Sequence, residues 1–178
     1  MSLSPDSHER FAAWMAAHGG ILERVARSHA RGERERADLG RELAFQLWLS
    51  AARFDGAAQS TTWIYRVCLN TALTWRRNAG RRERRTDGAV EVAELRTEAP
   101  SPASAAERGD LLEHLYSALR QLSDADRSLL LLQLDGLAYR DIADVLGITE
   151  NHVGVALNRA RQRLAAQMKG VIDELAGT

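Results

Sequence analysis

The stretch Tyr139–Val153 reads Tyr-Arg-Asp-Ile-Ala-Asp-Val-Leu-Gly-Ile-Thr-Glu-Asn-His-Val and decides the fold of the C-terminal part of the chain. Apolar residues at helical spacing predict a short helix over Ala138–Leu146 and a second helix over Glu150–Met168. Between them, Gly147 can adopt the positive φ of a tight turn, and Ala143 is small where two helices would cross closely. This pattern predicts a helix-turn-helix, whose second helix enters the major groove of DNA.

Polar residues follow the turn on the second predicted helix. Those that could face DNA are Asn151, His152, Asn158, Arg159, Arg161 and Arg163. The apolar residues expected in the core of this domain are Ile142, Leu146, Ile148, Val153 and Leu157. An ordinary helical hairpin is the alternative, but the glycine, the small residue and the downstream arginines together favour a DNA-binding motif.

The composition predicts an all-α fold in two small helical domains. Ala, Leu, Arg and Glu dominate, which are good helix formers, and no stretch shows the alternation of a strand. The segment Thr86–Glu107 contains Asp87-Gly88 and Pro100-Ser101-Pro102 and has little periodicity, so it is typical of a linker. We therefore expect an N-terminal domain over residues 1–85, a linker over 86–107 and the helix-turn-helix domain over 108–178.

Further helices are expected in both domains. The apolar pattern predicts N-terminal helices over Ser7–Ala17, Ile21–Ala30, Arg36–Arg53 and Thr61–Asn78, with Gly19-Gly20 ending the first. It predicts C-terminal helices over Gly109–Leu122 and Asp124–Leu134 ahead of the helix-turn-helix. Ser123 is placed to cap the latter, because its hydroxyl can accept a hydrogen bond from a free backbone N–H.

Arginines and aromatic residues gather on and after the helix over Thr61–Asn78. Six arginines and one acidic residue lie within residues 76–85, more than a solvated helix end requires, so phosphate contact is favoured. The formal net charge of the chain is zero, but a local basic patch decides contact with a polyanion. Trp63, Tyr65, Arg66 and Trp75 could stack on unpaired bases, although the two tryptophans are more typical of core anchors.

The order of these features resembles the extracytoplasmic function (group IV) sigma factors of bacterial RNA polymerase, in the sigma-70 family. The segment Asp38–Trp48 reads Asp-Leu-Gly-Arg-Glu-Leu-Ala-Phe-Gln-Leu-Trp and is similar to region 2.2, which grips the polymerase clamp helices. Phe54-Asp55-Gly56, Trp63–Arg66 and Asn70 together are similar to region 2.3, which helps to melt and read the −10 element.

The C-terminal half carries the rest of the resemblance. Leu119–Arg127 followed by Gly136–Ala143 is similar to region 4, which reads the −35 element. The resemblance implies a transcription initiation factor that binds core RNA polymerase and directs it to promoter DNA. It also implies an anti-sigma factor as a further partner.

The resemblance implies three sets of contact residues. Contacts with core polymerase are expected from Asp38, Leu39, Arg41, Glu42, Phe45, Gln46 and Trp48. Contacts with DNA on the −10 side are expected from Ser60, Tyr65, Arg66, Asn70, Arg76 and Arg77. Contacts with DNA on the −35 side are expected from Asn151, His152, Asn158, Arg159 and Arg161.

The sequence departs from the family's usual pattern at several positions. Arg41 stands where the family usually has Gln, and Thr74 stands where it usually has Asp. His152-Val153-Gly154-Val155-Ala156 stands where it usually has Thr-Val-Lys/Arg-Ser-Arg, so two basic DNA contacts are missing. We expect weaker binding in the groove or an unusual −35 preference, since a good base contact is worth roughly 1–3 kcal/mol.

The sequence carries no enzyme signature, because it has no glycine-rich phosphate loop, no His-Glu-x-x-His and no nucleophile elbow. We expect no catalytic residue, metal or cofactor, since the five histidines are scattered. Cys68 is the only cysteine and is expected to be a buried, inert thiol. No apolar run approaches the roughly 20 residues of a membrane span, and Met1–Arg10 does not resemble a signal peptide. We therefore expect a cytoplasmic protein without membrane insertion.

Two other functions stay open. A stand-alone helix-turn-helix regulator would use its N-terminal half as a dimerisation module and bind palindromic duplex DNA without polymerase. A sigma-like protein that has lost promoter recognition would act through protein contacts alone, and the missing arginines of the second helix motivate that alternative.

Overall fold

The fold is all-α, as the composition predicts. The computed structural model describes residues 5–78 and 103–176, which form helices and no strand. The helices are α1 (Pro5–His29), α2 (Gly32–Ala51), α3 (Ser60–Arg77), α5 (Ala103–Gln121), α6 (Asp124–Leu134), α7 (Tyr139–Leu146) and α8 (Glu150–Ala176). The arginines of residues 81–85 and residues 86–102 of the predicted linker lie outside the described residues.

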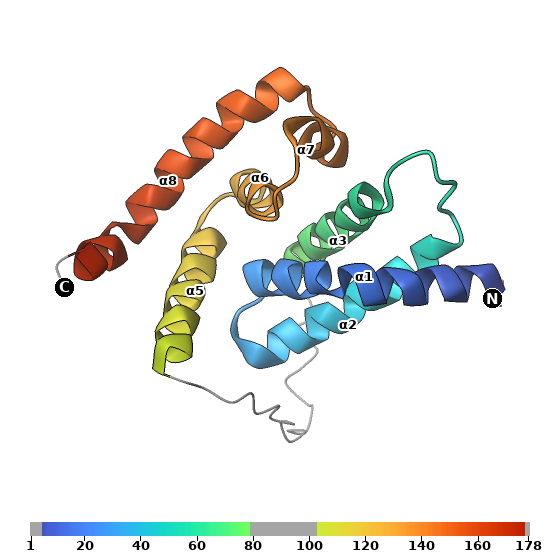
Figure 1. The fold of residues 1–178 in the computed structure, drawn as a ribbon, viewed down its shortest axis with the longest axis horizontal. Helices are drawn as coiled ribbons and strands as arrows, with labels where there is room; N and C mark the ends of the chain where they lie inside the picture. The colour runs from blue at the N-terminus through green and yellow to red at the C-terminus, as the bar shows by residue number, and fades with distance from the viewer. Residues whose placement is uncertain (1–4, 79–102, 177–178) are drawn as a thin grey trace.

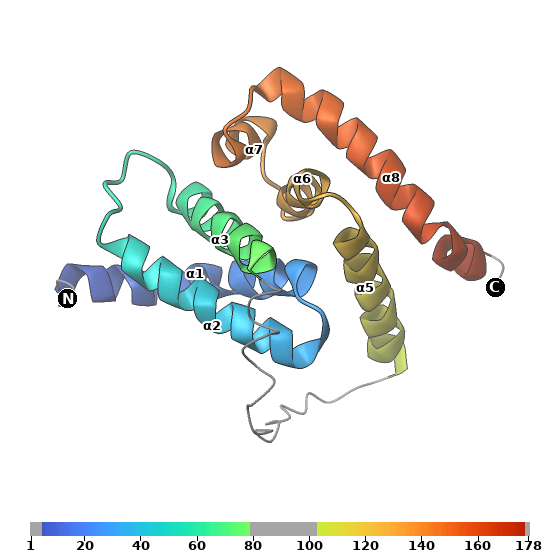
Figure 2. The ribbon, with the colours of Figure 1, turned by 180° about the vertical axis from the view of Figure 1, so that it is seen from behind.

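The helices form two units that lie against each other (Figure 1 and Figure 2). In the N-terminal unit α1, α2 and α3 pack on one another, and in the C-terminal unit α8 packs on α5, α6 and α7. Leu39, Leu43 and Leu47 follow at four-residue spacing along one face of α2 and are fully buried. The two units also share an interface, because α1 contacts α5 and α6 and α3 contacts α7.

The helix-turn-helix is confirmed at the predicted residues. Gly147 has a φ of 68° at the end of α7, and its N–H donates to the carbonyl oxygen of Ala143 at 2.8 Å. The predicted core is present, with Ile142, Val153 and Leu157 fully buried and Leu146 and Ile148 packed against them. The predicted cap of α6 is also present, because the Ser123 hydroxyl accepts from the Asp126 N–H at 3.2 Å.

Several helix boundaries differ from the prediction: α2 begins at Gly32 rather than at Arg36, and α8 extends to Ala176 rather than to Met168. The helices expected on either side of Gly19-Gly20 are one helix, because α1 runs unbroken through both glycines. Each glycine costs a helix about 1 kcal/mol relative to alanine, but Trp14 and Ile21 are buried on the two sides of the pair, and their packing offsets that cost. In addition, α5 begins at Ala103 rather than at Gly109, so it reaches into the segment predicted as a linker.

Candidate nucleic-acid and protein interfaces

The outward face of α8 is determined by the residues that the helix buries. Val153, Leu157 and Ala160 are fully buried against the rest of the unit. The exposed side chains on the opposite side of the helix are Asn151, His152, Val155, Asn158 and Arg159. Four of the five residues predicted to contact DNA on the −35 side therefore share one solvent-facing surface.

Arg161, the fifth residue predicted on the −35 side, is held differently. Its side chain is exposed, but its Nε donates to Oε1 of Gln133 on α6 at 3.0 Å. Further along α8, Nη1 of Arg163 lies 2.6 Å from a carboxylate oxygen of Asp126. These two arginines thus tie α8 to α6, and Arg159 is the arginine of the outward face.

The residues predicted to contact DNA on the −10 side all lie on α3, but only part of them faces solvent. Ser60 is half-buried at the start of the helix, and Asn70 and Arg77 are exposed. Arg66, in contrast, donates to the carbonyl oxygen of Asp144 on α7. Arg76 pairs with the carboxylate of Asp124 on α6. Two arginines predicted to contact DNA are therefore engaged by the C-terminal unit.

Tyr65 is the third of the −10-side residues that contact the C-terminal unit. The sequence predicts it as a DNA contact, but it is only 1% exposed in this arrangement. Its hydroxyl donates to the carboxylate of Asp135, and Nε of Arg24 lies 2.5 Å from the same carboxylate. Burial and the neighbouring Asp135 raise the pKa of Tyr65, so the hydroxyl keeps its proton and acts as the donor.

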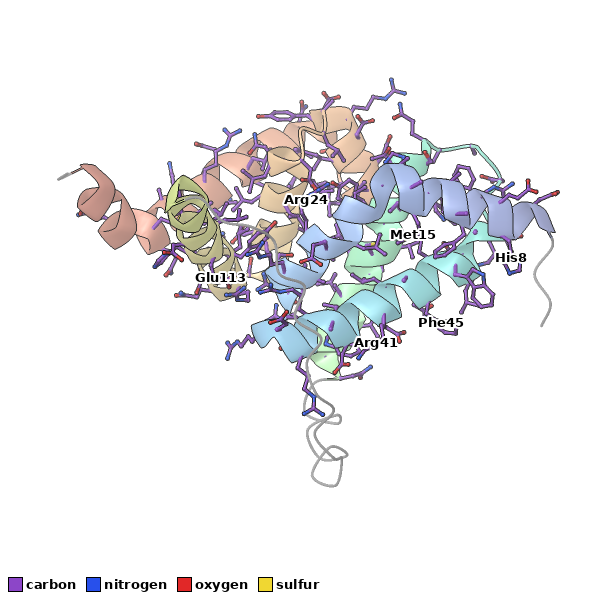
Figure 3. All side chains as sticks on the ribbon, turned by 60° about the horizontal axis from the view of Figure 1, so that its bottom comes forward. His8, Met15, Arg24, Arg41, Phe45 and Glu113 are labelled. Carbon is purple, nitrogen blue, oxygen red and sulfur yellow. The ribbon has the colours of Figure 1, made fainter. Side chains whose placement is uncertain are left out.

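A second polar cluster joins the units at Glu113 of α5 (Figure 3). Its carboxylate lies 3.2 Å from Arg27 of α1, 3.5 Å from Arg36 of α2 and 3.0 Å from Arg120 of α5. Partial burial opposes the charged form, but hydrogen bonds from Arg120 and Arg27 outweigh it and hold the pKa of Glu113 below its ordinary value. Ion pairs therefore contribute to the interface between the units, in addition to a hydrophobic core that includes residues of both.

The residues predicted to contact polymerase lie on α2, and most of them reach its surface. Arg41 pairs with Asp38 one turn earlier, and Gln46 donates to Glu42 at 2.9 Å. Phe45 is 51% exposed, a large fraction for an aromatic side chain. Arg41 and Phe45 project from α2 away from the C-terminal unit (Figure 3). This surface is suited to a protein partner with apolar and charged groups.

One predicted contact on α2 is wrong, and one neighbour was missed. Leu39 is fully buried, because its place in the leucine repeat turns it into the core, so it is not a surface contact. His8 of α1 lies beside this surface, with its ring centroid 6.0 Å from that of Trp48, which in turn lies 6.0 Å from Phe45. The sequence offered no signal for His8, since the contact joins two separate helices.

The described residues contain no group of His, Cys, Asp and Glu side chains that could hold a metal ion. Cys68 is fully buried, which confirms the prediction of a buried thiol, and burial raises the pKa of this thiol to about 12. Within the described ranges, no helix is both long and apolar enough to cross a membrane.

A family model matches the C-terminal unit, and two relatives match most of the chain. The family model described as "Sigma-70, region 4" matches residues 112–164, which run from α5 into α8. The chain is 27% identical over 147 residues to the RNA polymerase sigma-H factor of Pseudomonas aeruginosa, covering 79% of this chain and 76% of that protein. It is also 27% identical over 135 residues to the ECF RNA polymerase sigma-E factor of Haemophilus influenzae, covering 71% of each.

Two solved structures share the fold. The sigma factor RpoE in complex with the anti-sigma factor NepR, from Bartonella quintana, matches with a TM-score of 0.64 at 22% identity, over 89% of this chain and 96% of that chain. CnrH in complex with the cytosolic domain of CnrY matches with a TM-score of 0.62 at 22% identity, over 90% and 88%. Both matches extend over both helical units.

Proposed function

The chain belongs to the extracytoplasmic function (ECF) sigma factors of the sigma-70 family, and on that premise we propose that it is a transcription initiation factor that binds core RNA polymerase and directs it to promoter DNA. The observation that carries the proposal is the presence, in one chain, of a helix-turn-helix and a separate exposed aromatic surface on α2. A helix-turn-helix alone would serve any DNA-binding protein.

We assign polymerase binding and recognition of the −10 element to the N-terminal unit, and recognition of the −35 element to the C-terminal unit. The N-terminal domain, residues 1–85, would bind polymerase through Asp38, Arg41, Phe45 and Trp48 of α2 and the −10 strand through α3. The domain over residues 108–178 would place the outward face of α8 in the major groove of the −35 element. The linker, residues 86–107, would let the two domains reach both elements. The polymerase performs the chemistry, so this role asks for no catalytic residue in the chain.

Promoter binding requires the observed interface to open. Tyr65, Arg66 and Arg76 cannot contact DNA while they contact Asp135, Asp144 and Asp124. An anti-sigma factor could hold the protein in such a closed form, and the RpoE structure contains a partner of that class. We place the protein in the cytoplasm, where polymerase and promoter are found.

The proposal is tested by two binding measurements made side by side. Size-exclusion chromatography with purified core polymerase should show the chain in the polymerase peak, and a gel shift should show promoter binding only when polymerase is present. Binding of the chain alone to palindromic duplex DNA, as a dimer, would instead indicate a stand-alone regulator.

A further inference from the structure

Val155 occupies the centre of the outward face of α8. The helix turns by about 100° per residue, which places Val155 opposite the buried Val153 and Leu157. Its side chain is 56% exposed, whereas those of Val153 and Leu157 are fully buried. The side chains around it, Asn151, His152, Asn158 and Arg159, are all polar and exposed, so one aliphatic group stands within a hydrogen-bonding surface.

The fold accounts for only part of the valine side chain at this position, since it is not buried in the core. The side chain borders an open cavity of about 450 Å³, which Leu73 of α3 and Leu129 of α6 also line, and it keeps 56% of its surface exposed. Valine is also a poorer helix former than alanine or arginine, because its branched Cβ loses rotamer freedom in a helix. Helix stability therefore does not favour valine here, and the exposed half of its side chain is available for a contact outside the chain.

The major groove offers one apolar group on the base edges, the C5-methyl group of thymine. Asparagine and arginine on the same face are suited to adenine and guanine, which present hydrogen-bonding edges. We propose that Val155 determines specificity in the −35 element by contacting the methyl group of one thymine. The inference rests on the proposed function, because it assumes that this face of α8 meets promoter DNA.

The residues on either side of Val155 support a close approach to the groove. A valine side chain is short, so its methyl groups reach a base only if the helix backbone comes near. Gly154 and Ala156, which lie about 100° to either side of it around the helix, carry little or no side chain, and Ala156 packs against the core. The departure from the family's pattern at residues 154–156, which alone predicts weaker binding, therefore exchanges charged contacts for an apolar one.

The test replaces thymine by uracil, which lacks only the methyl group. A promoter selected by the full chain with core polymerase is resynthesised with one thymine of the −35 element changed at a time, and the affinity of the polymerase complex is measured. We expect one position at which uracil weakens binding about fourfold, the effect of one buried methyl-sized group. The variant Val155→Ala should lose about the same factor and no longer distinguish thymine from uracil at that position.

Two further variants control for folding and shape. Leu134→Ala removes an equally exposed aliphatic side chain at the end of α6 and should leave the uracil profile unchanged. Val155→Ile keeps an aliphatic side chain and should keep the sensitivity. If Val155→Ala and the unaltered chain show the same uracil profile, the inference is wrong, although promoter binding stands. If the unaltered chain with polymerase selects no promoter, the proposed function fails and the inference falls with it.

Discussion

The hydroxyl of Tyr65 donates a hydrogen bond to the carboxylate of Asp135, 70 residues further along the chain, and Arg24 pairs with the same carboxylate. This contact joins α3, which we assign to the −10 strand, to the turn that precedes the helix-turn-helix. The side chain of Asp135 is only 9% exposed, so the contact is largely withdrawn from water. Whether α3 is free to contact the −10 strand therefore depends on the position of the C-terminal unit.

The first prediction concerns opening of this interface. Asp135→Asn keeps the shape of the side chain but removes the charge that meets Arg24 and Tyr65. A hydrogen bond to a charged group contributes roughly 1.5–3 kcal/mol, and the amide of asparagine keeps part of that energy. The ratio of closed to open protein should therefore fall about tenfold. Small-angle X-ray scattering should show a larger radius of gyration, and single-stranded −10 DNA should bind more tightly.

A matched pair of arginine variants controls this experiment. Arg24→Gln, which removes the partner on α1, should act in the same direction as Asp135→Asn but less strongly, because the Arg24 side chain is 39% exposed. Arg34→Gln changes an exposed arginine at the start of α2 and should have no effect on the radius. An unchanged radius in both interface variants would show that Asp135 does not hold the units together.

The second prediction concerns the buried Arg127. Its guanidinium donates to the carbonyl oxygens of Leu119 at 2.9 Å and Leu122 at 2.8 Å, at the end of α5. Burial, and after it the charges of Arg76 and Arg120, lowers the pKa of Arg127 to about 10, so it remains charged at neutral pH. Arg127→Met leaves these carbonyls without a donor and should lower the free energy of unfolding by about 3–5 kcal/mol in urea titrations. Arg140→Met, at an exposed position, should change it little.

The third prediction concerns the pH dependence of stability. Burial, and after it the nearby charge of Arg127, lowers the pKa of His29 from 6.5 to about 4. The folded protein therefore binds this proton less readily than the unfolded chain, and stability is fully present above pH 6.5 and falls as the pH drops toward 4. The loss at pH 5 should be about 2 kcal/mol.

Urea titrations at pH 8, 6 and 5 would measure this dependence. The variant His29→Asn should be less stable at pH 8 but should lose most of the dependence between pH 6.5 and 5. His114→Gln, an exposed histidine, should retain it. The same slope in His29→Asn as in the unaltered chain would assign the acid sensitivity to other groups.

The fourth prediction concerns the aromatic surface on α2. Phe45→Ala should weaken binding to core polymerase about thirtyfold, because a central aromatic anchor of an interface is commonly worth about 2 kcal/mol or more. Half of its surface is already exposed, so the fold should tolerate the change. Leu111→Ala, at an exposed position on α5, is the matched control. Equal affinities for the two variants, measured by biolayer interferometry, would remove Phe45 from the interface.

Local sequence patterns predicted the helix-turn-helix well, because Gly147, the Ser123 cap and the core residue Ile142 act within a few residues of their partners. They did not predict that Tyr65 is buried, since this burial depends on Asp135 in the other unit. Leu39 was misplaced for a related reason: the segment's resemblance suggested a contact, whereas its helical register turns it inward.

Run-off transcription with purified core polymerase tests the central claim most directly. The template carries a promoter selected by the chain from a genomic library, and reactions with polymerase alone provide the baseline. If the chain is an initiation factor, it should produce a transcript of defined length that depends on the chain and on both promoter elements. Binding of the chain to the polymerase without any such transcript would contradict promoter-directed initiation and would favour a sigma-like protein that acts through protein contacts alone.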